Sequence, residues 1–247
     1  MNSGFYSAFA GLAARMDALD LVANNLANAN TTGFKSQHEF YTAYAAAMSN
    51  AGNSPMTPIN AAINDFGVIG GTRLDLSAGS LDKTGNDTDL AIQGSAFFVI
   101  KTAAGTRYTR NGNFTLNSQR ELVTATGDPV LGQQGPIQIP SGKFTIASDG
   151  TLSVNGDVVD QLQLANLGRG IEMAPEGNGY LTAPAAEIKP ATDSTVLQGS
   201  LEASNANPVS NAVALIELQR NAELLQRALS IFNNEFNQTA AQVLPQV

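Results

Sequence analysis

Few side chains of this sequence could carry out chemistry. The chain has no cysteine and one histidine, His38. The absence of cysteine excludes disulfides, thiolate metal sites and cysteine nucleophiles. Any histidine-dependent catalysis or metal binding would rest on His38 alone, which has no second histidine or carboxylate cluster beside it. We therefore interpret His38 as an ordinary surface or linker residue.

Two short patterns are similar to ligand-binding loops but lack essential positions. Ser141-Gly142-Lys143 is followed by Phe144, where a phosphate-binding loop needs Ser or Thr to reach magnesium. The Asp87-x-Asp89 pattern lacks the other oxygen ligands and the terminal Glu of a calcium loop, so we interpret it as a turn. The sequence therefore predicts no catalytic, cofactor-binding or metal-binding residues.

The charge balance excludes several classes of partner. The 247 residues include 13 Lys and Arg and 21 Asp and Glu, which gives a net charge of −8, and only 14% of residues are charged. Nucleic-acid binders need a basic surface, so no nucleic-acid partner is expected. No apolar run approaches the ~20 residues of a membrane span, and we expect no membrane insertion. The N-terminus lacks the basic and apolar regions of a Sec signal peptide, so any export is expected to use another route.

Apolar residues recur at helical spacing near both ends of the chain, which predicts an amphipathic helix at each end. The N-terminal stripe follows a heptad repeat, and the C-terminal stripe runs in alternating steps of three and four after an Asn207-Pro208 helix start. One-sided helices with so little charge are not stable alone in water. We expect them to pair in a coiled-coil-like seam, with each other or with other chains. The predicted interface positions of this seam are Phe5, Leu12, Leu19, Leu26, Leu218, Leu225, Leu229 and Phe232.

Between the helices, the pattern changes to short β segments separated by Gly, Asn, Asp and Pro. The clearest hairpin joins Thr151–Val154 to 157–159 through Asn155-Gly156, because Asn-Gly favours a type I′ turn. Short, evenly spaced strands predict a β meander or a partly open barrel. The predicted fold class is α+β. Its parts are an N-terminal helix in 1–36, an extended linker in 37–72, a central β domain in 73–204 and a C-terminal helix in 205–247.

The N-terminal helix leads into the string ANNLANANTTGFKS, which is denser in Asn than a helix end requires. This string resembles the signature of the flagellar axial proteins, which are the rod, hook and hook-associated subunits. Three further strings resemble later motifs of that family in the same order, namely LAIQGSAFFV, YTRNGNF and GSLEASN. The residues that carry the resemblance are Asn24, Asn25, Leu26, Asn28, Gly33, Phe34, Gly94, Phe97, Phe98, Tyr108, Thr109, Arg110, Gly112, Glu202, Ser204 and Asn205.

Three positions depart from the family pattern. Ala96 replaces the second glycine of the strand motif, Arg120 stands where a turn glycine is usual, and Ala222 replaces an aromatic residue often found in the C-terminal helix. The chain length and the stretch GPIQIP at 135–140 look most like a rod subunit of the basal body. A distal-rod or hook-type subunit is the alternative within the family.

The resemblance implies a structural subunit of the flagellar basal-body rod, the drive shaft of a motility organelle, and not an enzyme. It implies export through the flagellar type III apparatus in an unfolded state, location in the periplasmic rod, and assembly with other rod and axial subunits, including copies of the same chain. Two alternative functions from other protein classes stay open. The first is a secreted β-domain binding or adhesin module, which would not explain the matched helices at both ends. The second is a rod-associated glycan hydrolase, which would need a pair of catalytic carboxylates.

Overall fold

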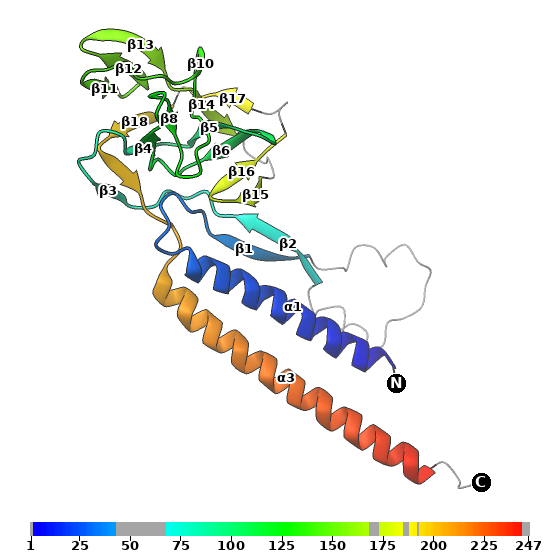
Figure 1. The fold of residues 1–247 in the computed structure, drawn as a ribbon. Helices are drawn as coiled ribbons and strands as arrows, with labels where there is room; N and C mark the ends of the chain where they lie inside the picture. Colours follow the sequence, from blue (N-terminus) through cyan, green and yellow to red (C-terminus); the bar gives the residue numbers. More distant parts are fainter. Residues whose placement is uncertain (1, 43–67, 168–172, 185–187, 192, 244–247) are drawn as a thin grey trace. The chain divides into compact units, whose positions relative to one another are not determined.

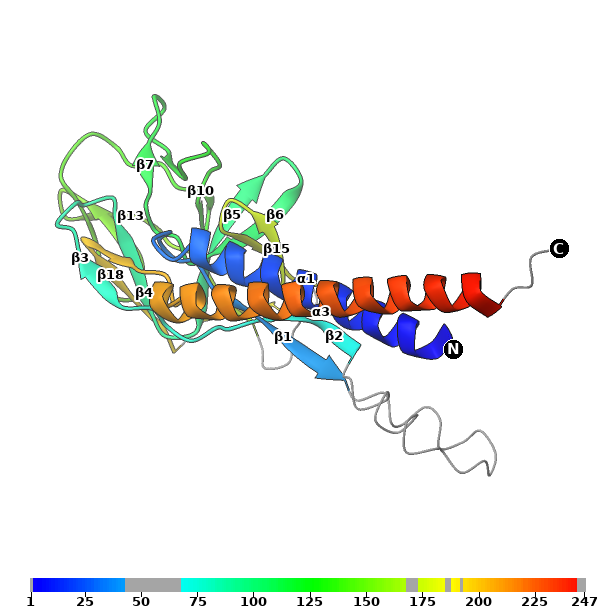
Figure 2. The same cartoon turned by 90° about the horizontal axis from the view of Figure 1, so that it is seen from below.

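The computed structural model of the chain describes residues 2–42, 68–167, 173–184, 188–191 and 193–243. Two long helices flank a β-rich central region along the chain, which confirms this part of the predicted fold class (Figure 1). Helix α1 covers Asn2–Ala27 and helix α3 covers Pro208–Val243. The two helices contact each other and run side by side in both views (Figure 1, Figure 2). Within the described residues, neither helix combines the length and apolar character that crossing a membrane would require.

Helix α1 ends at Ala27, well before the end of the predicted helical region at 36. The cause is local, because the backbone N–H of Thr31 donates to the carbonyl oxygen of Asn28 at 3.0 Å and the Thr31 hydroxyl donates to the Asn28 side chain at 3.2 Å. These bonds offer the backbone an alternative to another helical turn. Gly33 then adopts a φ of 66°, a left-handed conformation that favours glycine.

The β-rich region consists of short strands. Their bounds are β3 Leu81–Lys83, β4 Leu90–Gln93, β5 Ala96–Thr102, β6 Gly105–Thr109, β7 Thr115–Leu116, β8 Leu122–Val123, β9 Leu131–Gly132, β10 Gly135–Pro136, β11 Phe144–Ile146, β12 Thr151–Val154, β13 Asp157–Gln161, β14 Leu164–Leu167, β15 Ala174–Gly177, β16 Tyr180–Thr182, β17 Ile188–Pro190, β18 Thr195–Gln198 and β19 Ser200–Glu202. Strands β12 and β13 pair across Asn155 and Gly156, whose φ angles are 53° and 100°. The predicted Asn-Gly hairpin is thus confirmed.

Antiparallel pairing joins these strands into several sheets. The largest has the order β15-β16-β6-β5-β14-β17, and a second has the order β11-β12-β13. The pairs β18-β4, β19-β3, β7-β8 and β10-β9 account for the other named strands of this part of the described chain. Because the largest sheet ends in an edge strand on each side, it is open and does not close into a barrel.

Strand β5 lies at the centre of the hydrophobic core and is buried on both faces. Phe98 and Ile100 point into the larger core cluster, where the Phe98 ring meets the Phe114 ring edge-on with 5.1 Å between centroids. Phe97 and Val99 contact a second cluster on the opposite face of the strand. Burial on both faces explains why the sequence of this strand is the continuous apolar run AFFVI and does not alternate between apolar and polar residues.

The chain divides into two compact units. The helical unit comprises Met1–Ala27, Gln37–Arg73 and Pro208–Val247, and the β unit comprises Asn28–Ser36 and Leu74–Asn207. The β unit is therefore built from two separate stretches of chain. One stretch directly follows α1, and the other ends directly before α3.

The range 37–72, which we predicted to be an extended linker, contains a strand at each end. β1 (Gln37–Thr42) pairs with β2 (Val68–Leu74), and residues 43–67 lie outside the described residues. Asn25 fixes the start of β1, because its Nδ2 donates to the Gln37 carbonyl at 2.8 Å and its Oδ1 accepts the Gln37 N–H at 3.0 Å. The periodicity of the sequence does not reveal this pairing, because the partners are far apart along the chain and β2 contains two consecutive glycines.

Candidate functional site

Three charged side chains meet inside the β unit, and we call them the buried ion cluster. The Nζ of Lys35 lies 2.6 Å from Oε1 of Glu202, and Nη1 of Arg110 lies 3.2 Å from Oε2 of the same carboxylate. Each of the three side chains exposes at most 2% of its surface. Charges this deeply buried must be paired and hydrogen-bonded, because desolvation of each one is costly.

Backbone groups complete the ammonium and carboxylate sides of the cluster. Lys35 Nζ also donates to the carbonyl oxygen of Ser77 at 2.6 Å, and the N–H of Gly79 donates to Oε1 of Glu202 at 3.0 Å. Burial lowers the pKa of Lys35 below its ordinary value, while the hydrogen bond and charge of Glu202 oppose that change. The carboxylate of Glu202 therefore offsets part of the desolvation cost of the buried ammonium.

The guanidinium of Arg110 links the cluster to the central strands. It donates to the carbonyl oxygens of Ile92 at 3.3 Å and Gly94 at 2.6 Å, and it lies over the Phe97 ring, 4.8 Å from the ring centroid. Burial lowers the pKa of Arg110, and the Glu202 charge opposes this. A planar cation that binds carbonyls, a carboxylate and an aromatic face at once fixes the local geometry in a way that lysine could not.

The two chain segments beside the helices are joined at the cluster by hydrogen bonds. The N–H of Gly33 donates to the carbonyl of Glu202 at 2.7 Å, and the N–H of Asn205 donates to the carbonyl of Phe34 at 3.3 Å. The Asn205 side-chain oxygen accepts the N–H of Ser36 at 2.7 Å. The first stretch of the β unit, which follows α1 in the sequence, and its last segment, which precedes α3, are thus held together.

Two motif glycines are required by close backbone contacts. A Cβ at Gly112 would lie 1.6 Å from the carbonyl oxygen of Leu90, and a Cβ at Gly33 would lie 2.3 Å from the backbone of both Arg110 and Asn111. Any side chain at either position would force the segments of the cluster apart.

The remaining motif residues hold neighbouring segments. The hydroxyl of Thr109 donates to the Gly179 carbonyl at 2.9 Å, and the hydroxyl of Ser204 accepts the N–H of Ala206 at 3.1 Å. Tyr108 is buried in the second core cluster, and burial raises the pKa of its hydroxyl. Asn24 lies on the exposed side of α1.

The predicted seam positions fall on one side of each helix. The positions that are partly buried are Leu12, Leu19, Leu26, Leu218, Leu225 and Leu229. The side chains of Phe5 and Phe232 lie outside the described residues. Ala222, one of the departures from the family pattern, is buried on the same side of α3 as Leu218 and Leu225.

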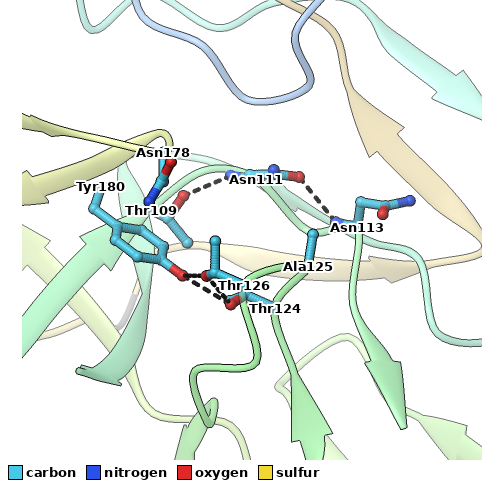
Figure 3. A pocket seen from close by; sticks show the side chains of 8 residues that line it. All are labelled: Thr109, Asn111, Asn113, Thr124, Ala125, Thr126, Asn178 and Tyr180. Carbon is cyan, nitrogen blue, oxygen red and sulfur yellow. Dashed lines mark hydrogen bonds between the residues drawn. The ribbon is translucent and has the colours of Figure 1, made fainter. Parts of the chain in front are cut away.

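A small polar pocket in the β unit is lined by side chains that hydrogen-bond to one another (Figure 3). The side chains that line it include Thr124, Thr126 and Tyr180, and the Tyr180 hydroxyl lies 2.7 Å from each threonine hydroxyl. Its volume of about 30 Å³ is close to that of one water molecule. Burial raises the pKa of Tyr180, so its hydroxyl is a neutral hydrogen-bonding group.

Parts of the chain match three flagellar sequence families. Residues 5–35 match the flagella basal body rod protein family, residues 91–154 match the flagellar hook protein FlgE/F/G D1 domain, and residues 197–242 match the flagellar basal body rod FlgEFG protein C-terminal family. The chain is 38% identical over 217 residues to the flagellar basal-body rod protein FlgF of Caulobacter vibrioides, and the match covers 85% of each chain.

More distant relatives match over nearly the whole length. FlgF of Salmonella typhimurium is 30% identical over 252 residues, which cover 95% of this chain and 96% of its own. The rod protein FlgG of Borreliella burgdorferi is also 30% identical, over 258 residues with the same coverage. This chain belongs to the flagellar basal-body rod protein family. The resemblance stated from the sequence motifs is thereby confirmed.

Membership in the rod protein family makes the chain a structural protein of the flagellar basal body and not an enzyme. It also implies assembly with other axial subunits of the flagellum. The buried ion cluster takes one residue from each matched range, with Lys35 in the first, Arg110 in the second and Glu202 in the third. The cluster therefore joins the three family-matched parts of the chain at one point.

The sequence analysis names Arg110 and Glu202 of this rod protein as motif residues but does not single out Lys35 or pair the three charges. One signal could have found the pairing. Each of the strings ANNLANANTTGFKS, YTRNGNF and GSLEASN holds a single charged residue, and the two cations and one carboxylate have opposite signs, so burial of these strings together would favour mutual ion pairs.

Arg120 shows how this rod protein accommodates a departure from the family pattern. It adopts a φ of 61°, a conformation that usually favours glycine. Its side chain donates to the carbonyl oxygens of Ile139 at 2.6 Å and Pro140 at 3.0 Å. These hydrogen bonds offset the backbone strain. Ala96, the other departure in the β unit, is fully buried, and its N–H donates to the Ser194 hydroxyl at 3.1 Å.

Proposed function

We propose that this rod protein is built into the rod through α1 and α3, which pair in a coiled-coil-like seam and are covered by the helices of neighbouring subunits. The observation that carries the proposal is that the face of α3 opposite its partly buried side exposes large aliphatic side chains beside Arg220 and Arg227. The inner face holds the partly buried Leu218, Leu225 and Leu229. The outer stripe holds Val213, Ile216, Leu224 and Ile231, which are 52%, 53%, 62% and 57% exposed.

The geometry of a helix separates these two faces fully. At about 100° per residue, the four outer-stripe residues fall within an arc of about 80°, centred about 180° from the inner face. An amphipathic helix at the surface of a monomer buries one stripe and exposes charge on the other side. A second apolar stripe is typical of a helix packed between neighbours, because each buried aliphatic side chain contributes about 1.5–3 kcal/mol.

The two units then have separate tasks. The helical unit supplies the contacts that build the rod. The β unit packs against neighbouring subunits, and the buried ion cluster joins its first stretch of chain to its last segment. Delivery of the unfolded chain by the flagellar type III export apparatus fits a sequence without cysteine, because no disulfide has to form after export.

Substitution of a seam leucine tests the proposal. Leu19→Asp or Leu225→Asp places a carboxylate in the seam, where its desolvation opposes packing. We expect a deletion strain that carries either variant to be non-motile, with rods that are absent or truncated in electron micrographs of its basal bodies. The purified variants should retain the β unit, as judged by its circular dichroism and unfolding midpoint.

Gln219→Asp is the matched control, because it introduces the same residue at an exposed position of α3 that lies between the inner face and the outer stripe. That strain should swim and build normal rods. Normal motility and complete rods with the Leu19 and Leu225 variants would show that the seam does not support assembly.

A further inference from the structure

Three Asn-Gly pairs occur in the sequence, at Asn111-Gly112, Asn155-Gly156 and Asn178-Gly179. Asparagine is a thermolabile residue, because the next main-chain nitrogen can attack its side-chain amide. Glycine at the next position favours this attack, since it has no Cβ to shield its nitrogen. The local sequence therefore favours the reaction at all three pairs, and the folded structure decides which of them reacts.

The Asn111-Gly112 pair is held at both of its residues. Oδ1 of Asn111 accepts hydrogen bonds from the Thr32 hydroxyl at 2.8 Å and from the Asn113 N–H at 3.0 Å. Gly112 is buried, and its carbonyl oxygen accepts the Leu90 N–H at 3.0 Å. Rotation of the Asn111 amide toward the Gly112 nitrogen would break both hydrogen bonds of the amide, so this pair is protected.

The other two pairs occupy equivalent turns. Asn155-Gly156 joins β12 to β13, and Asn178-Gly179 joins β15 to β16, each as a two-residue loop. The φ angles are 53° and 100° in the first turn and 52° and 74° in the second. Because the backbone has the same left-handed character in both turns, the difference between the two pairs lies in the surroundings of their amides.

The side chain of Asn155 is held by the segment before β11. Its Oδ1 accepts the N–H of Lys143 at 3.3 Å, and the main-chain N–H of Asn155 donates to the Lys143 carbonyl at 3.0 Å. The amide also packs against Gly142, where a Cβ would lie 2.5 Å from Nδ2 of Asn155. The amide can turn toward the Gly156 nitrogen only after these contacts break.

The side chain of Asn178 lacks such contacts. It is exposed, and it forms no hydrogen bond with any other part of the described chain. Figure 3 shows it beside Tyr180 on the wall of the small polar pocket, without a bond to the other residues drawn. Strand β15, which leads into this turn, is an exposed edge strand of the largest sheet. Water therefore reaches the turn, and the amide is free to rotate.

We propose that Asn178 is the site at which the folded chain deamidates. The main-chain nitrogen of Gly179 loses its proton and forms a bond to Cγ of Asn178. The side-chain nitrogen takes up a proton and leaves as ammonia, so that a cyclic imide remains. Water then breaks one C–N bond of the imide and leaves aspartate or isoaspartate at this position.

The modification affects a residue of the family motif. The Gly179 carbonyl accepts the hydroxyl of Thr109 at 2.9 Å, and isoaspartate would lengthen the main chain immediately before this acceptor. The new carboxylate would also lie two residues from Glu176, which already pairs with Arg107. The reaction requires only the folded β unit, so the inference does not depend on the proposed route of assembly.

Peptide mapping by mass spectrometry measures the reaction at each asparagine in purified full-length chain incubated at mildly alkaline pH. We expect Asn178 to react at least about fivefold faster than Asn155, a factor that corresponds to one net hydrogen bond. In denaturant, all three pairs should react at similar rates, because only the local sequence remains. Similar rates at Asn178 and Asn155 in the folded chain, faster reaction at Asn111, or an unchanged preference for Asn178 in denaturant would overturn the proposal.

Asn178→Gly and Asn155→Gly form a matched pair of variants, because glycine adopts the positive φ that both turns require. Circular dichroism checks that both variants are folded. Isoelectric focusing during the incubation should show an acidic form that accumulates in wild type and in Asn155→Gly but not in Asn178→Gly. Accumulation at the wild-type rate in Asn178→Gly would assign the reaction to another asparagine and refute the proposal.

Discussion

Replacement of Glu202 by Gln is expected to lower the free energy of unfolding of the β unit by about 3–5 kcal/mol, the range for breaking a buried ion pair from one side. The substitution leaves the ammonium of Lys35 and the guanidinium of Arg110 buried without the carboxylate that both contact. Urea titration of the purified variant, followed by circular dichroism, measures the change.

The cluster holds two cations and one carboxylate, so substitutions of its members should lower the stability of the β unit by unequal amounts. Lys35→Met leaves Arg110 paired one-to-one with Glu202, so its loss of stability should be clearly smaller than that of Glu202→Gln. Glu176→Gln is the matched control, because it removes the same group from the exposed ion pair with Arg107 and should not move the midpoint. Equal losses at Glu202 and Lys35 would contradict the assigned charge balance.

The second large loss of stability is expected for a substitution at Gly112. Gly112→Ala should cost about 3 kcal/mol of stability in the β unit, the upper part of the usual range for overpacking. A Cβ at this position would lie 1.6 Å from the Leu90 carbonyl oxygen, so the two backbones must separate. That movement would also weaken the hydrogen bond from the Leu90 N–H to the Gly112 carbonyl, which is 3.0 Å long. Thermal unfolding of the purified variant measures the loss.

Gly11→Ala provides the opposite control. Gly11 lies inside α1, and a Cβ there would meet nothing within 4 Å. Alanine should therefore stabilise the helix by about 0.5–1 kcal/mol. A loss of stability at Gly11 comparable to that at Gly112 would show that the effect comes from losing glycine in general and not from the contact with Leu90.

Local features of this fold could be predicted from the sequence because local physics decides them. The heptad spacing of Leu12, Leu19 and Leu26 indicates a helix, and Asn155-Gly156 indicates a hairpin, since only a few neighbouring residues determine each structure. The sequence predicts too late an end for α1, because Gly33 is the visible stop signal. The competing hydrogen bonds between Asn28 and Thr31 end the helix earlier.

Non-local features could not be predicted in the same way. The pairing of β1 with β2 and the meeting of Lys35 with Glu202 both depend on the path of the intervening chain. The Asn-rich string illustrates the difference. Its density of Asn exceeds what a helix end requires, and only the structure shows that Asn25 uses both polar atoms of its amide to bind the backbone of Gln37 in the same chain.

The composition of the β unit from two separate stretches of chain also determines when the unit can fold. Lys35 and Glu202 are 167 residues apart, and bringing such distant residues together carries a large loop-closure entropy. Contacts at this separation form slowly compared with local turns. Lys35 therefore has no carboxylate partner until Asn28–Ser36 and the segment up to Asn207 have come together. The topology of the chain thus makes closure of the buried ion cluster depend on almost the whole length of the β unit.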